Sequence, residues 1–238
     1  PLYKAEVIVF PAEENHTGGL QGSMGSSLQL LMPQLSSSTD DVSKHLSILE
    51  SYAFLSTFIE ERRILESLFY QEWDDENNTW DQDQPTSEQA YRALRGILEH
   101  EREASTGLIR MSITWHDKEI ASVWANQIIT DLNNHIRALD IQDTKLSLDY
   151  IQEEISKTSL KIPQNVLYNI SSELTSKMMM ANTKEEYAFE IIDFARPPAF
   201  RFFPQRTTIV ILSTAIGFIL ACILSILFNI FRNLTKSY

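Results

Sequence analysis

The sequence predicts an α+β fold, in which a small mixed sheet with helices carries a very long projecting α-helix and a transmembrane helix near the C-terminus. Three observations support this prediction. Residues 207–231 contain no charged side chain, and a helix of about 25 residues, rising about 1.5 Å per residue, is longer than the roughly 30 Å hydrocarbon core of a bilayer. Residues 117–158 contain neither Gly nor Pro, which favours one long helix. Three segments rich in β-branched and aromatic residues are typical of strands.

A predicted α/β base occupies residues 1–115. Its first strand covers residues 3–10 and ends before Pro11. Residues 16–39 are rich in Gly and Ser and predict a mobile loop, which is either an ordinary surface loop or one that contributes to subunit contacts. This loop lacks the Gly-Lys-Ser/Thr sequence that a phosphate-binding loop requires.

One long helix is expected next in the base. Asp40 or Asp41 is placed to cap it, and apolar residues recur at helical spacing to about residue 69. A polar and acidic segment follows, which predicts a solvated loop. Trp73 and Trp80 lie within this segment, and indoles in so polar a context are expected to pin the loop onto the body of the domain.

A second helix and a second strand complete the predicted base. Thr86 or Ser87 is placed to cap the helix, which covers residues 87–103. Apolar and polar residues then alternate through residues 108–115, as in a strand with one buried face.

The long helix and a return helix form the next predicted unit, residues 116–185. A helix from Asp117 to about Thr158 exceeds about 60 Å, so it must project beyond the core or pack against copies of itself, and we expect a homo-oligomer. Pro163 interrupts the helical pattern. A further helix is expected at residues 164–181, and a third strand at residues 186–195. The three strands are expected to meet in one sheet close to the membrane.

The chain is predicted to enter the membrane through a stiff junction. The final strand and this junction make up residues 186–206, and Pro197, Pro198 and Pro204 keep the junction non-helical. The span, residues 207–231, is followed by a short tail, residues 232–238. A buried core helix is the alternative interpretation of the apolar run, but core helices are shorter and usually keep a polar stripe. Basic residues flank the run on both sides, so charge does not decide its orientation.

Small side chains recur every four residues in the predicted span and lie on one helical face. This spacing predicts a surface where another membrane helix packs closely, although small residues are also common in membrane helices by composition alone. The residues of this face are Ser213, Gly217, Ala221 and Ser225.

The charge distribution excludes several partners. No Asp or Glu follows Asp193, so the residues up to Ala199 hold all 32 acidic side chains against 16 of the 20 basic ones. Such a domain repels phosphate backbones and anionic headgroups, which argues against a nucleic-acid partner and predicts hydrophobic attachment to a lipid bilayer. The single cysteine, Cys222, permits no intrachain disulfide. Cysteine pairing therefore does not indicate whether the domain lies in a reducing or an oxidising compartment. The chain starts at Pro1 without an initiator Met, and we expect further residues upstream of it.

The sequence shows no pattern of an active site. It lacks a Gly-x-Ser-x-Gly elbow, a His-Glu-x-x-His pair and a dinucleotide-binding glycine pattern. The aspartates of the polar segment lack the Gly and terminal Glu of a helix-loop-helix calcium site. The five histidines are dispersed along the chain. We therefore predict no catalytic, metal-binding or cofactor-binding residues and no enzymatic activity.

The order and spacing of many short motifs resemble the polysaccharide co-polymerase family, the Wzz-like chain-length determinant proteins of bacterial cell-envelope glycans. The resemblance covers nearly the whole chain. Its motifs are Tyr3-x-Ala5, residues 41–58, Leu68-Phe69, Trp73-Asp74, Trp80, Thr106-Gly107-Leu108, Trp115-x-Asp117, Ala121-x-x-Trp124-Ala125-Asn126, Leu132-Asn133-x-x-Ile136-Arg137, Tyr150-Ile151, Leu167-Tyr168, Glu186-Tyr187-Ala188-Phe189, Ile192-Asp193 and the proline-rich junction.

The resemblance implies an inner-membrane protein with two spans, both termini in the cytoplasm and a periplasmic main domain that assembles into a ring. It implies a role in setting the length of O-antigen, capsule or exopolysaccharide chains, with a membrane glycan polymerase as partner and lipid-linked polysaccharide as a further one. A membrane-anchored periplasmic sensor or adaptor ectodomain is the alternative. The short C-terminal tail disfavours the sensor, unless a signalling domain precedes Pro1.

Overall fold

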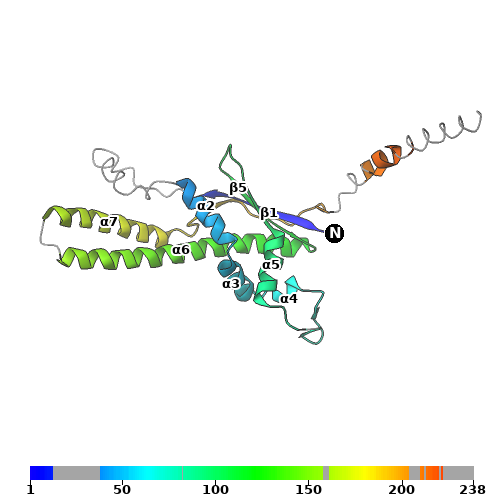
Figure 1. The fold of residues 1–238 in the computed structure, drawn as a ribbon, viewed down its shortest axis with the longest axis horizontal. Helices are drawn as coiled ribbons and strands as arrows, with labels where there is room; N and C mark the ends of the chain where they lie inside the picture. The colour runs from blue at the N-terminus through cyan, green and yellow to red at the C-terminus, as the bar shows by residue number, and fades with distance from the viewer. Residues whose placement is uncertain are drawn as a thin grey trace, which may run out of the picture.

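The structure is a computed structural model that describes residues 1–12, 38–81, 83–157, 161–203, 210, 211, 213–219 and 221. The predicted mobile loop, residues 16–39, lies outside this part of the chain except for its last two residues. The elements, in chain order (Figure 1), are β1 (Tyr3–Pro11), α2 (Ser38–Leu49), α3 (Tyr52–Arg62), α4 (Leu65–Leu68), β2 (Trp73–Asp74), β3 (Thr79–Trp80), α5 (Ser87–Ile97), β4 (Leu98–Arg102), β5 (Ile109–Trp115), α6 (Lys118–Lys157), α7 (Lys161–Thr183) and β6 (Phe189–Asp193).

The main sheet has four strands in the order β4-β5-β1-β6. Every pair in it is antiparallel, so the prediction of a mixed sheet is wrong. The three predicted strands are confirmed, and β4 is an additional one. In β1, Tyr3 lies opposite Trp115 of β5, and Val9 lies opposite Ile109. This register brings the start of β1 to the end of β5, where α6 begins.

Strand β4 occupies residues that were predicted to continue a helix. Helix α5 begins as expected, with a capping box between Thr86 and Gln89, but it ends at Ile97. Leu98 then pairs with Ile113 of β5, and both side chains are buried. The open edge of β5 offers unpaired backbone groups, and pairing with them outweighs the helical preference of the charged residues that follow.

The single helix predicted between residues 40 and 69 is three helices. Ser51 separates the first two, because its hydroxyl caps α3 by accepting the backbone N–H of Phe54 at 3.2 Å. Arg63, with φ of 51°, ends α3 in the left-handed conformation. These breaks allow Leu49 of α2 and Phe58 of α3 to be buried together in one core, which one straight helix would not permit.

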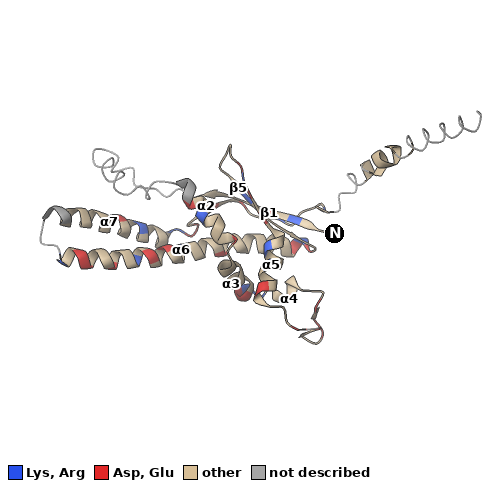
Figure 2. Ribbon diagram, in the orientation of Figure 1, with Lys and Arg blue, Asp and Glu red and all other residues tan. Residues whose placement is uncertain are grey.

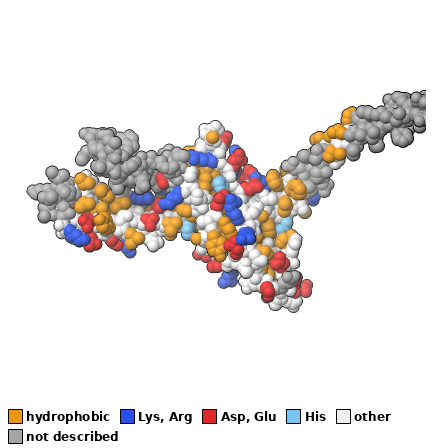
Figure 3. Space-filling view, viewed as in Figure 1, with side chains coloured by type: hydrophobic (Ala, Val, Ile, Leu, Met, Phe, Trp, Pro, Cys, Tyr) orange, Lys and Arg blue, Asp and Glu red, His pale blue; other side chains and the backbone are white. Residues whose placement is uncertain are grey.

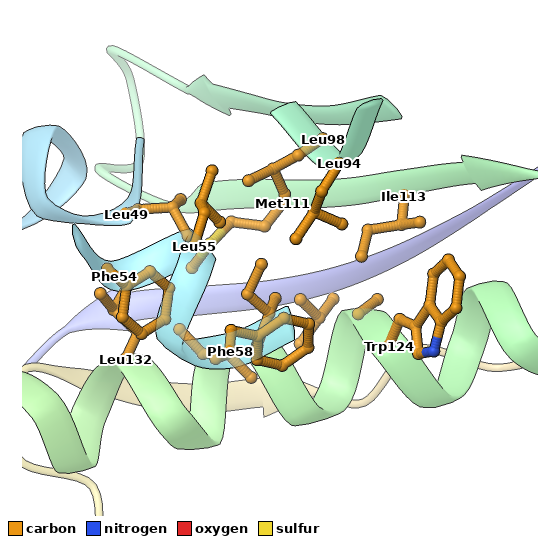
Figure 4. Close-up of a cluster of buried hydrophobic side chains, with 14 of the residues drawn as sticks. Leu49, Phe54, Leu55, Phe58, Leu94, Leu98, Met111, Ile113, Trp124 and Leu132 are labelled. Atoms are coloured by element: carbon orange, nitrogen blue, oxygen red, sulfur yellow. The ribbon is translucent and has the colours of Figure 1, made fainter. Parts of the chain in front are cut away.

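The core lies between one face of the sheet and the helices that cover it (Figure 4). Buried residues alternate along β1, as expected for a strand with one packed face, whereas Met111, Ser112 and Ile113 of β5 are buried in succession. The first half of α6 supplies Trp124, Ile128 and Leu132. The labelled side chains of Figure 4 point toward one another from α2, α3, α5, β4, β5 and α6.

Helix α6 is the predicted long helix, with 40 residues and a length of about 60 Å. Asp117 caps it, because its Oδ1 accepts the backbone N–H groups of Glu119 at 2.8 Å and Ile120 at 3.2 Å. Beyond Ile136 the helix leaves the sheet, and α7 runs back beside it (Figure 1). Pro163 lies inside the first turn of α7, where its missing N–H costs no helical hydrogen bond.

The polar segment after α4 is a short hairpin rather than a loop. Strands β2 and β3 pair Trp73 with Trp80, and the two indoles pack edge to face with centroids 4.9 Å apart. Asp74 accepts the backbone N–H groups of Glu76 and Asn77 and so holds the turn between the strands.

Candidate functional site

Two distant parts of the chain meet at one end of the sheet. The N–H of Leu2 donates to the carbonyl of Phe203 at 3.0 Å, and the N–H of Phe202 donates to the carbonyl of Leu2 at 2.8 Å. The residue before β1 and the end of the proline-rich junction therefore leave the domain side by side. Pro197 is exposed and Pro198 half-buried in the irregular segment after β6, while Pro204 lies outside the described residues.

The predicted membrane span lies mostly outside the described residues. Ser213, Gly217 and Ala221 are helical and exposed, and a Cβ added at Gly217 would have no neighbour within 4 Å. Ser225 lies outside the described residues. Within the described ranges, none of the helices has the length and apolar character needed to cross a bilayer. The close packing of this face with another helix stays a prediction.

Two asparagines of α6 bind the backbone on either side of β6. The side chain of Asn133 is buried; its Nδ2 donates to the carbonyl of Phe189 at 2.8 Å, and its Oδ1 accepts the N–H groups of Ala188 at 2.9 Å and Phe189 at 2.8 Å. Two turns earlier, Asn126 makes the same type of pair with the N–H and carbonyl of Ala195. These bonds fix the last strand to the long helix.

Two further α6 residues bind the connection between α7 and β6. Arg137 donates to the carbonyl of Lys184 at 3.1 Å, and Asp140 accepts the hydroxyl of Tyr187 at 2.8 Å. Asp140 also forms an ion pair with Lys177 of α7 at 3.3 Å. We call Asn126, Asn133, Arg137 and Asp140 the hairpin root. They set the direction in which the α6–α7 hairpin leaves the sheet.

Asn126, Asn133 and Arg137 belong to motifs of the sequence, but no sequence pattern predicts what they bind. Their backbone partners lie 47 to 69 residues further along the chain, so no local pattern identifies them. One signal was present: Asn133 follows Leu132 within the apolar part of α6, and a buried amide must find hydrogen-bond partners.

A second polar cluster joins the turn after α2 to α5 and β4. Oε1 of Glu50 lies 2.5 Å from Arg95 Nη2 and 2.8 Å from His100 Nε2, and the hydroxyl of Tyr91 donates to the carbonyl of Glu50. Partial burial acts to raise the pKa of Glu50. The hydrogen bonds from His100 and Arg95 and the charge of Arg95 outweigh it, so the pKa lies below its ordinary value of 4.5.

The depressed pKa of Glu50 predicts an acid-sensitive contribution to stability. This contribution is complete above pH 4.5 and is lost as the pH falls through the lower pKa of the folded state. Glu50→Gln should cost about 1 kcal/mol at neutral pH, a modest value because the carboxylate is partly exposed. Urea unfolding between pH 3 and pH 7 should show this cost shrinking toward low pH. Glu60→Gln, at an exposed position of α3, should leave the curve unchanged; an equal loss in both variants would contradict the assignment.

A small depression lies between α3 and α6, with a volume of about 240 Å³. It is smaller than the clefts of roughly 300–1,000 Å³ that hold small-molecule ligands. Two of its polar side chains are already engaged, because Asp131 binds Arg62 and Asn134 binds Arg137. No cluster of metal-ligating side chains occurs among the described residues. The side chains that line the depression therefore fit a structural contact better than a catalytic site.

Comparison with known proteins gives structural neighbours only. No protein-family model matches the chain, and no curated protein matches it by sequence. A solved fragment of WzzB, a polysaccharide co-polymerase from Salmonella Typhimurium, has a TM-score of 0.38 and 10% identity, covering 86% of this chain and 100% of that one. A full-length bacterial polysaccharide co-polymerase has a TM-score of 0.35 and 14% identity over 98% of this chain and 87% of that one.

A third neighbour is a mutant of the Shigella flexneri lipopolysaccharide O-antigen chain-length regulator WzzBSF. Its TM-score is 0.27 and its identity 12%, with 84% of this chain and 100% of that one covered. The structural neighbours of this chain are thus Wzz polysaccharide co-polymerases, at low structural overlap and low sequence identity.

Proposed function

We propose that this protein regulates the chain length of a bacterial surface polysaccharide, such as O-antigen, capsule or exopolysaccharide, as an oligomeric ring that works with a membrane glycan polymerase. The observation that carries the proposal is the α6–α7 hairpin, which is tied to the sheet through the hairpin root. The motif series of the sequence resembles chain-length determinants and supports the same function.

The hairpin surface supports self-association. Beyond Ile136, the only buried residue of α6 among those described is Thr144. Among the residues of α7 whose burial the structure describes, 164–183, Ala181 is the only buried apolar one. A two-helix hairpin has too few neighbours to bury its apolar surface alone. Leu139, Leu146 and Tyr150 lie along one exposed face of α6. We therefore expect neighbouring copies to pack along their hairpins and to close into a ring.

The membrane arrangement is part of the proposal. The main domain would stand in the periplasm on the bacterial inner membrane, with residues 207–231 as one span and another upstream of Pro1. The meeting of Leu2 with Phe203 fits this arrangement, because it brings both ends of the domain to the same place. Catalysis would belong to the polymerase, and the oligomer would bias the moment at which the lipid-linked glycan is released.

The proposal is tested in a bacterium that carries the matching polymerase but lacks its own length regulator. Expression of the full chain should convert a broad distribution of extracted polysaccharide into a narrow one around a preferred length on a gel. An unchanged distribution, at a normal level of membrane-inserted protein, would refute the proposal.

The small face of the predicted span gives a sharper prediction in the same assay. Gly217→Leu places a large side chain where another helix is expected to approach, so the preferred polysaccharide length should shift or broaden. Gly217→Ala keeps the side chain small and serves as the matched control. If both variants give the wild-type length at normal protein levels, this face plays no part in length control.

A further inference from the structure

Four exposed apolar side chains gather where the two ends of the domain meet. Leu2 is 38% exposed, Phe200 87%, Phe202 43% and Phe203 57%. We call these four residues the apolar collar. In the space-filling view, apolar side chains are visible where the chain leaves the body toward the C-terminal helix (Figure 3). Clustered exposed aromatic side chains are costly in water and usually mark an interaction surface.

The collar is held firmly against the sheet. Three backbone hydrogen bonds between Leu2 and the Phe202–Phe203 pair fix its centre. Lys4 Nζ lies 5.3 Å from the centroid of the Phe202 ring and 2.8 Å from Glu99 Oε2 of β4. The collar therefore has a defined orientation relative to β1 and β4, unlike a fraying terminus.

The local charge of the collar differs from that of the domain. The whole chain carries a formal charge of −12, yet no acidic residue follows Asp193. Arg201 lies between Phe200 and Phe202 and is exposed, and Arg196 is exposed nearby. The acidic excess is concentrated in residues 72–83, which hold six acidic side chains and no basic one, whereas the α6–α7 hairpin carries both signs of charge (Figure 2). Charges beyond about 10 Å are largely screened at physiological ionic strength. Within the collar region, Arg196 pairs with Asp193 at 3.4 Å and Lys4 pairs with Glu99 at 2.8 Å. Arg201, between Phe200 and Phe202, is therefore the cation that an approaching anionic surface meets at the collar.

The collar also lies close in sequence to the apolar run. Thr207, the first residue of that run, is four residues after Phe203, a reach of at most about 14 Å even for extended chain. The headgroup layers add about 5–7 Å on each side of the hydrocarbon core. With residues 207–231 spanning the bilayer as proposed above, a collar tethered this closely to them lies near the headgroups.

We propose that the apolar collar is a lipid-contacting surface that inserts into the boundary between headgroups and acyl chains, with Arg201 and Arg196 on the phosphates of anionic lipids. Aromatic rings and snorkelling arginines suit this layer. A second copy of this chain fits less well, because two collars that face each other would bring like charges together. This surface rests on the membrane arrangement proposed above, but not on the polysaccharide function.

The test uses the full chain in lipid nanodiscs. A single cysteine is introduced by Phe200→Cys or Phe203→Cys in a Cys222→Ser background and labelled with an environment-sensitive fluorophore. Tyr168→Cys on α7 is the matched control, since Tyr168 and Phe203 are both 57% exposed. With bromine-labelled lipids in discs containing phosphatidylglycerol, quenching at both collar positions should exceed that at residue 168 by at least about threefold. Arg201→Gln should remove most of the dependence on phosphatidylglycerol.

Three results would overturn the inference. Equal quenching at the collar and at residue 168 would show that the collar stays in water. A blue-shifted label without lipid quenching, accompanied by cross-links between collar cysteines of different copies, would assign the collar to a subunit interface. The third result is equal quenching in discs of phosphatidylcholine alone, with no effect of Arg201→Gln. It would show that the arginines do not bind anionic lipid.

Discussion

Asn133→Ala should lower the free energy of unfolding by about 3 kcal/mol or more. The side chain is 2% exposed and makes three hydrogen bonds to the backbone at the start of β6. Alanine cannot replace any of them, and each buried polar group left without a partner costs about 1–3 kcal/mol. For a domain of this size, the melting temperature should fall by about 10 °C.

Two other asparagines on α6 calibrate this prediction. Asn126→Ala removes two backbone bonds at a half-buried position and should cost less than Asn133→Ala. Asn134→Ala changes an exposed residue that accepts a bond from Arg137 and should cost least. Thermal unfolding of the detergent-solubilised chain, followed by circular dichroism, should give this order. If Asn133→Ala melts no lower than Asn134→Ala, the hairpin root does not hold β6.

Combining Leu146→Asp with Tyr150→Asp should dissociate the oligomer. Leu146 is 62% exposed and Tyr150 is 63% exposed on the same face of α6, so the substitutions do not disturb the domain core. Burying each of these side chains between copies would contribute about 2 kcal/mol, and a buried carboxylate without a partner adds a further cost. Association should weaken by at least about a thousandfold, which analytical ultracentrifugation in detergent measures.

A matched control adds the same two negative charges elsewhere on α6. Ser147→Asp with Gln152→Asp changes exposed positions that lie away from the Leu146–Tyr150 face. This control should remain oligomeric with an unchanged melting temperature. Equal dissociation in both double variants would mean that net charge, and not the apolar face, governs assembly.

Hydrophobic periodicity predicted the elements whose patterns are long or strongly alternating. Helix α6 and strands β1, β5 and β6 follow directly from spacing. Strand β4 could not be predicted, because its residues are charged and form a strand only through the open edge of β5. The break at Ser51 depends on how Leu49 and Phe58 reach a common core, and this is a tertiary requirement.

The candidate site could be predicted only in part. The sequence identified the proline-rich junction and predicted that the long helix projects from the core. The contact between Leu2 and Phe203 joins residues from opposite ends of the domain and has no signature in either segment. The hairpin root has the same character, since each of its side chains binds a group from a distant part of the chain that the fold brings close.

The most direct test of the proposed function measures polysaccharide length with the Leu146→Asp, Tyr150→Asp variant. Wild-type protein and the Ser147→Asp, Gln152→Asp control are expressed at equal levels in the strain that lacks a length regulator, and the extracted polymer is separated on a gel. The proposal predicts that the control retains the preferred length, whereas the variant gives the broad distribution of the strain without a regulator. A preferred length that persists in a variant shown to be monomeric in the membrane would contradict it.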